Sequence, residues 1–251
     1  MSMRLPDFII GGAPRSGTTW LYHLLSLHPG IFMARPVKPE PKFFLIDEQY
    51  REGLGYYSSK WFRDCPAGKI AGEKSTNYLE SPEAARRILK DLRDVKMVFI
   101  FREPAVRAYS NYLWTKMNGL ETESFGRALE LEEQRERTLP ERLKYARPYS
   151  YFSRGLYAGL IGPYLELGRE RILCLRCEDI AQRPGELAAR LHRFLGVEPR
   201  PGDAGSLGVV NAATGEDEPA PEHLMSALRK RYRAHNERFY RLIGGDFEPW
   251  E

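Results

Sequence analysis

The strongest constraint on the fold is an apolar run that ends in a glycine-rich turn and continues as an amphipathic helix. Residues 8–11 (FIIG) precede GAPRSGTTW, in which Gly12 and Gly17 have the spacing G-x-x-x-x-G. Apolar residues then recur at helical spacing, at Trp20, Leu21, Leu24, Leu25 and Leu27, before a stop at His28-Pro29-Gly30. A strand, a glycine turn and a helix in this order are typical of a phosphate-binding loop.

Further apolar runs predict the rest of a sheet. KMVFIF (96–101) and RILCL (171–175) have the continuous apolarity of strands covered on both faces, and KIAGEK around Ile70 is a weaker fourth. Helices are predicted after Ser81, an N-cap followed by Pro82, and over 185–195 and 221–243. Because strands and helices alternate, we expect an α/β fold, a three-layer α/β/α sandwich with a central, mainly parallel sheet.

The length of 251 residues suits one large α/β domain, 1–251. One segment departs from the alternation. Residues 121–147 are dense in charge and have no strand between their helices. We expect a helical excursion on the surface, acting either as a lid or as a solvated hairpin.

Charge and hydropathy limit the partners. The net charge of +4 is too small to indicate nucleic acid, although it permits a local basic pocket for an anion. No apolar run approaches the roughly 20 residues of a membrane span, and residues 1–6 do not resemble a signal peptide. We therefore expect no nucleic-acid partner, no stable membrane insertion and a cytoplasmic location, and the oligomeric state stays open.

The three cysteines do not form a disulfide framework. Cys174 and Cys177 make a CxxC pair, but it lies at a predicted strand, where an offset of three places the two side chains on opposite faces. With no second Cys or His pair nearby, we interpret them as core and strand-end thiols. No His, Cys and Asp cluster has the spacing of metal ligands, so no metal site is predicted.

The glycine turn lacks the lysine of a nucleoside triphosphate loop, because Thr18 stands at that position of G-x-x-x-x-G-K-[ST]. Arg15 supplies a cation from inside the turn instead, and Thr18 and Thr19 add hydroxyl groups. PRSGTTWL resembles the 5′-phosphosulfate loop of the sulfotransferases that use 3′-phosphoadenosine 5′-phosphosulfate (PAPS). The resemblance implies a set of PAPS-binding residues here: Arg15, Ser16, Gly17, Thr18, Thr19 and Trp20.

A second motif follows the strand 96–101. FREPAVRAYSNY resembles the 3′-phosphate motif of the same family, which implies that Arg102 and Ser110 bind the 3′-phosphate. An arginine at a strand end offers a bidentate fork, and a serine on the next helix can donate a hydroxyl. Arg107 and Tyr109 are assigned to packing or to the surface.

A third set of residues carries the predicted chemistry. VKPEPKFFL resembles the catalytic segment of sulfotransferases that modify heparan sulfate and of related bacterial enzymes, and it places Glu40 at the catalytic glutamate. Lys42 stands where that family usually has histidine. GEKSTNYL resembles a further family segment, in which Lys74 matches a lysine that contacts the sulfuryl region or the acceptor.

The resemblance covers most of the chain, from about Phe8 to about Gly196, and implies in-line transfer of the sulfuryl group to a carbohydrate or small-molecule acceptor. Glu40 would act as general base on a hydroxyl or amine, Arg15 would stabilise the leaving phosphate, and Lys42 or Lys74 would steady the sulfuryl oxygens. The region 208–224 carries no basic residue, so we predict no PAPS ligand there and a different kind of cover.

Two alternatives compete with this interpretation. A phosphate-loop kinase or hydrolase would use the G-x-x-x-x-G turn with Asp179 as its magnesium ligand, but without the lysine the β- and γ-phosphates lose their main cation. A non-catalytic nucleotide-binding module on the same fold is the other alternative. The presence of Glu40 and Lys74 beside both phosphate motifs argues against it.

Overall fold

A computed structural model describes residues 3–208, 219–245 and 247–250 of the protein. The chain divides into two compact units, one formed by residues 1–101 and 163–210 and the other by residues 102–162 and 211–251. Most of the predicted cover after residue 208 lies outside the described residues, since 209–218 are among those not described.

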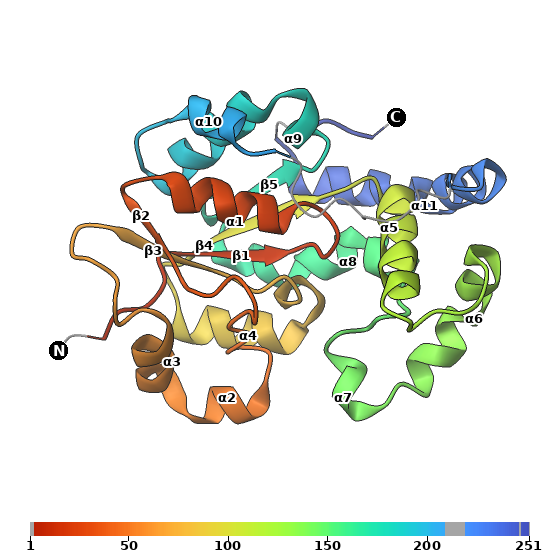
Figure 1. Ribbon diagram of the computed structural model, residues 1–251, viewed down its shortest axis with the longest axis horizontal. Helices are drawn as coiled ribbons and strands as arrows, with labels where there is room; N and C mark the ends of the chain where they lie inside the picture. Colours follow the sequence, from red (N-terminus) through yellow and green to blue (C-terminus); the bar gives the residue numbers. More distant parts are fainter. Residues whose placement is uncertain (1–2, 209–218, 246, 251) are drawn as a thin grey trace. The chain divides into compact units, whose positions relative to one another are not determined.

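The first unit is built on five parallel strands in the order β2-β3-β1-β4-β5 (Figure 1). The strands are β1 (Phe8–Gly12), β2 (Ile31–Met33), β3 (Ile70–Lys74), β4 (Lys96–Phe101) and β5 (Ile172–Arg176). The helices of this unit are α1 (Thr18–Leu27), α2 (Asp47–Arg51), α3 (Gly53–Trp61), α4 (Pro82–Asp91), α9 (Asp179–Gln182) and α10 (Pro184–Leu195).

Helices cover both faces of this sheet. On one face, side chains of α1 and α10 pack with alternate residues of β1, β4 and β5, such as Ile10, Val98 and Leu175, in one apolar core. On the other face lies α4 (Figure 1), and the ring of Tyr164 contacts that of Phe99 at 5.0 Å. The predicted α/β sandwich with a parallel sheet is therefore confirmed.

Local sequence explains most of these boundaries. The Ser81 side chain caps α4 by accepting a hydrogen bond from the Ala84 N–H at 3.0 Å, with proline in the first turn, as predicted.

Strand β2 was not predicted. It has three residues, pairs Ile31 with Ile70 and Met33 with Gly72, and follows directly on the His28-Pro29-Gly30 turn. An apolar run this short carries no periodicity that distinguishes it from a loop.

The second unit is helical. Its helices are α5 (Pro104–Met117), α6 (Phe125–Arg137), α7 (Glu141–Lys144), α8 (Tyr157–Ile161) and α11 (Glu222–Ile243). The charged segment 121–147 forms α6 and α7. Helix α6 contributes Phe125 and Ala128 to the apolar core of this unit, and its Glu132 accepts hydrogen bonds from the backbone N–H groups of Phe152 and Ser153 at 2.6 and 2.8 Å.

None of the three cysteines, all of which are described, forms a disulfide bond. In β5, Leu173 and Leu175 face the core beneath α1 and α10, and Cys177 packs against the same core, whereas Cys174 lies on the alternate face. Burial raises the pKa of the Cys174 thiol to about 12. The predicted placement of the two side chains on opposite faces is confirmed. Among the described residues, no helix is long and apolar enough to cross a bilayer.

Candidate active site

The glycine-rich turn joins β1 to α1 with a fixed backbone. The Ala13 N–H donates to the Ile100 carbonyl of β4 at 2.8 Å, which holds the start of the turn against the sheet. Gly17 precedes α1 with φ 91°, in the left-handed region. A Cβ atom at Gly17 would also lie 2.5 Å from Cδ1 of Ile180. Both the conformation and the space therefore require glycine at this position.

The N-terminus of α1 is arranged to receive an anion. The N-cap residue of this helix, Gly17, has no side chain that could cap it, as in other phosphate-binding turns that use the first N–H groups of a helix. Ser16, Thr18 and Trp20 are buried in the turn and the first helical residues, whereas Arg15 and Thr19 are partly exposed. The turn thus combines backbone donors, hydroxyl groups and one guanidinium, a set of groups suited to a phosphate or sulfate group.

Glu40 and Lys74 meet in an ion pair. The Lys74 amine contacts Oε1 of Glu40, and the two side chains are only 2% and 11% exposed. Thr76 completes the arrangement, because its N–H donates to Glu40 Oε2 at 3.2 Å and its hydroxyl lies 3.1 Å from both carboxylate oxygens. An ionised carboxylate is purely an acceptor, so this set of donors suits it.

The loop that contains Glu40 is held by hydrogen bonds to residues at and after β3 and by contacts between buried aromatic rings. The Lys42 N–H donates to the Ser75 hydroxyl at 2.9 Å, and Lys42 has a left-handed backbone with φ 49°. The rings of Phe43 and Tyr57 stack at 4.4 Å, and the Phe44 N–H donates to the Tyr78 hydroxyl at 3.2 Å. Prolines on both sides of Glu40 restrict the backbone further.

The glycine turn and the Glu40 cluster lie next to each other. Ile10 of β1 is in register with Lys74 of β3, and the Ser75 N–H donates to the Ile10 carbonyl at 3.0 Å. A Cβ atom at Gly12 would lie 3.1 Å from the carbonyl oxygen of Thr76, the residue that holds Glu40. The structure therefore brings together two motifs that are about 60 residues apart in sequence.

The second phosphate motif opens the second unit. Arg102 directly follows the last residue of β4, and Ser110 lies on the second turn of α5. Both side chains are partly exposed, and the Arg102 carbonyl accepts a hydrogen bond from the Tyr157 hydroxyl at 2.8 Å. Arg107 and Tyr109 are buried, with the Arg107 guanidinium donating to the Tyr151 carbonyl, so both residues pack in the interior.

Three residues beside the predicted site were missed from sequence, namely Glu73, Ser75 and Thr76. Glu73 is fully buried, and burial raises the pKa of its carboxyl to about 7 against the opposing effect of the Tyr57, Ser75 and Tyr78 hydroxyls. The available signal was the placement of GEKST at the end of an apolar strand, where four consecutive polar side chains cannot all face solvent.

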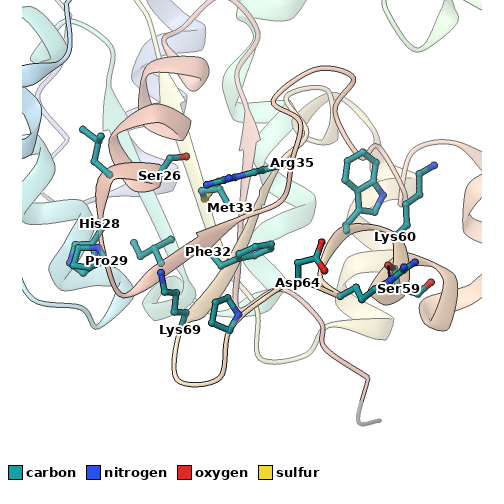
Figure 2. Close-up of a pocket in the computed structure, with 15 residues that line it drawn as sticks. Ser26, His28, Pro29, Phe32, Met33, Arg35, Ser59, Lys60, Asp64 and Lys69 are labelled. Carbon is teal, nitrogen blue, oxygen red and sulfur yellow. Dashed lines mark hydrogen bonds between the residues drawn. The ribbon is translucent and has the colours of Figure 1, made fainter.

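A separate cavity of about 660 Å³ lies in the first unit beside the edge strand β2 (Figure 2). The labelled side chains come from the end of α1 and the turn after it, from β2 and Arg35 just beyond it, from α3, and from the loop before β3, which contributes Asp64 and Lys69 (Figure 2). No residue predicted to bind PAPS or to take part in catalysis lines this cavity.

A parallel sheet with an uncapped helix N-terminus after its central strand defines an α/β protein with a phosphate-binding loop. The sequence pattern of the sulfotransferase domain matches residues 5–207. The chain belongs to the sulfotransferase domain family.

Relatives and solved structures agree with this assignment. The chain is 28% identical to the mouse (Mus musculus) heparan sulfate glucosamine 3-O-sulfotransferase 3B1 over 98% of its own length and 65% of that protein, so it spans about two thirds of this relative. It is 29% identical to human (Homo sapiens) heparan sulfate glucosamine 3-O-sulfotransferase 6, over 97% of the chain and 73% of that protein.

A sulfotransferase from Alicyclobacillus acidocaldarius superposes with a TM-score of 0.76 at 27% identity, covering 97% of this chain and 98% of that one. A mouse sulfotransferase crystallised with 3′-phosphoadenosine 5′-phosphate (PAP) shares the fold, with a TM-score of 0.56 at 17% identity over 96% of this chain and 85% of that chain.

Proposed function

We propose that the protein transfers the sulfuryl group of PAPS to a hydroxyl or amine of a carbohydrate or small-molecule acceptor. The observation that carries this proposal is the contact between the glycine turn and the Glu40 cluster, at Gly12 and Thr76. An anion-binding loop and a carboxylate held by donors are the two parts that sulfuryl transfer requires, one for the donor nucleotide and one for the acceptor proton.

The turn fits the 5′ end of PAPS. Gly17 has no Cβ atom and α1 has no side-chain cap, which leaves the helix N–H groups available to the 5′-phosphosulfate. Arg15 would provide the positive charge, supported by the hydroxyls of Thr18 and Thr19. In the second unit, Arg102 and Ser110 would bind the 3′-phosphate. Bound PAPS would supply an activated sulfuryl group on a nucleotide leaving group.

Glu40 would accept the proton of the attacking hydroxyl or amine. Its carboxylate is 11% exposed, enough to meet an acceptor at the surface of the site, while Lys74 and Thr76 fix its orientation. A positioned general base contributes typically about 10² to 10⁴ in rate. No step here requires a metal ion, because the cationic and amide groups of the chain fill that role.

Lys74 would first of all orient the base. Its amine is almost completely buried against Glu40, so removal of the amine would leave a largely buried carboxylate without its partner. Lys42, with its backbone held by Ser75 and a partly exposed side chain, is the better candidate for the sulfuryl oxygens.

The names of the relatives guide the choice of acceptor. Both are heparan sulfate glucosamine 3-O-sulfotransferases, so we propose a carbohydrate hydroxyl as the acceptor class, with glucosamine-containing chains as the first to test. A glucosamine residue presents both hydroxyl and amine groups to a base such as Glu40.

The substitution Glu40→Gln tests the proposal. It keeps the shape and removes the basic oxygen, so we expect turnover to fall at least 10²-fold while the Kd for PAP changes less than threefold. Transfer of ³⁵S from labelled PAPS to heparan sulfate oligosaccharides, and to a glycan extract of the source organism, measures turnover. Glu48→Gln, the same change at an exposed position on α2, is the control. Full turnover of Glu40→Gln would exclude Glu40 as the base.

A further inference from the structure

Glu73 is a buried carboxyl immediately before Lys74, yet no described residue forms an ion pair with it. It lies on β3 with no exposed surface, and its Oε2 atom accepts a hydrogen bond from the Ser75 hydroxyl at 3.0 Å. Successive side chains of a strand point to opposite faces, which separates the Glu73 carboxyl from the Lys74 amine that contacts Glu40. A fully buried acid that no described cation pairs carries a desolvation cost.

The Ser75 hydroxyl connects Glu73 to the loop of the proposed base. This hydroxyl has a single proton, which it donates to Glu73, and its oxygen accepts the Lys42 N–H at 2.9 Å. Lys42 is in the left-handed region with φ 49°, a strained conformation that non-glycine residues rarely adopt. The backbone two residues after Glu40 is therefore held in an unfavourable conformation by a hydrogen bond that depends on Glu73.

The charge of Glu73 is also coupled to that of Glu40. Burial raises the pKa of Glu73 to about 7, the hydroxyls of Tyr57 on α3, of Ser75 and of Tyr78 lower it, and the negative charge of Glu40 raises it further. Glu73 therefore changes charge near neutral pH, next to the loop that carries Glu40.

We propose that Glu73 is a positioning residue for Glu40, acting through the Ser75 hydroxyl and the Lys42 amide to fix the loop that contains the base. This inference rests on the proposed function, in which Glu40 is the base. It assigns a role in sulfuryl transfer to a side chain that touches neither donor nor acceptor.

Three substitutions test this role. Glu73→Leu and Ser75→Ala break the connection to Lys42, so we expect kcat to fall at least tenfold while the Kd for PAP changes less than threefold. Glu73→Gln still accepts a hydrogen bond from Ser75, so it should keep most of the turnover of the native enzyme. Glu48→Gln should match the native enzyme.

A measurement that needs no acceptor accompanies the kinetics. In ¹³C NMR of carboxyl-labelled glutamate, the Glu40 resonance should have the same chemical shift in the native protein, in Glu73→Gln and in Glu48→Gln, and should move in Glu73→Leu and Ser75→Ala. An unchanged Glu40 chemical shift in Glu73→Leu, or native kcat in Glu73→Leu, overturns the inference.

The same experiments keep the two proposals apart. Full turnover of Glu40→Gln contradicts the proposed function, whatever the Glu73 variants do. An inactive Glu40→Gln beside a fully active Glu73→Leu contradicts the role of Glu73 alone. A Glu73→Leu protein that loses PAP affinity as strongly as turnover also overturns the inference, because the residue would then support the whole fold rather than Glu40.

Discussion

Gly17 shows how one residue determines whether the loop can form. It combines φ 91° with the close approach of Ile180, so a methyl group at Cα meets both backbone strain and a steric clash. The residues around it were predicted from the glycine spacing and the resemblance. Ile180 was not, because it comes from α9, more than 150 residues away.

The substitution Gly17→Ala should therefore weaken PAP binding at least tenfold and lower the free energy of unfolding by about 1–3 kcal/mol. Calorimetric titration with PAP and urea unfolding measure the two effects. Gly202→Ala, where a Cβ atom meets nothing within 4 Å, is the control and should behave like the native protein. Native PAP affinity in Gly17→Ala would mean that the turn does not bind the nucleotide.

Part of the candidate site was predicted from the sequence, and part of it was not. Glu40 and Lys74 were predicted as separate motifs, and the structure joins them in an ion pair. Glu73 was missed because its role depends on which face of β3 it occupies, and Thr76, which follows β3, was missed because its role depends on the loop that contains Glu40. The residues selected as candidates came from local motifs, whereas these supporting contacts are long-range.

Among the secondary-structure elements, those with strong local signals were predicted to within a residue or two. Helix α4 has its serine cap and proline, and β4 is a continuous apolar run. Strand β5 begins one residue later than predicted, at Ile172, and β2 was missed because an edge strand of three residues is defined by its pairing with β3 rather than by its own composition.

The second phosphate motif begins just before helix α5 and continues into it. The substitution Arg102→Ala, at the start of this motif, tests its proposed role. Loss of a charge-assisted pair of hydrogen bonds should weaken PAP binding about 10²-fold and change the affinity for 5′-AMP less than threefold. Calorimetry with both nucleotides measures the difference. Arg127→Ala, an exposed arginine on α6 of the same unit, should leave both affinities unchanged. Equal weakening of PAP and 5′-AMP would show that Arg102 does not bind the 3′-phosphate.

For the molecule as a whole, the alternation of strands and helices was enough to predict the α/β sandwich, since period and order are encoded locally. The expectation of a single domain stays a prediction beside the two compact units of the structure. The cavity beside β2 was not predictable, because its lining comes from the end of α1, from β2, from α3 and from the loop before β3, which only the fold brings together.

The stability of the first unit should depend on the buried imidazole of His192. Burial and the neighbouring ring of His28, 4.9 Å away, lower the pKa of His192 to about 4. The folded protein thus keeps the ring neutral where the unfolded chain, with a pKa of about 6.5, takes up a proton. The stability that His192 contributes is complete above pH 6.5 and is lost as the pH falls toward 4.

Urea unfolding at pH 7.5 and pH 5 measures this effect. The pKa difference predicts that the native protein loses about 2 kcal/mol more than His192→Asn over this interval. His223→Asn, an exposed histidine on α11, should lose as much as the native protein. The same loss in all three proteins would show that His192 is not kept neutral by the fold.

The central claim is that the glycine turn holds a 3′-phosphorylated adenosine nucleotide rather than a nucleoside triphosphate. Calorimetric titration of the native protein with PAP and, separately, with ATP and magnesium compares the two directly. The account predicts that PAP binds at least 10²-fold more tightly than magnesium-ATP, because Thr18 replaces the lysine that a triphosphate needs, while Arg102 and Ser110 are proposed to bind the 3′-phosphate. Equal binding of the two nucleotides, or tighter binding of magnesium-ATP, would contradict it.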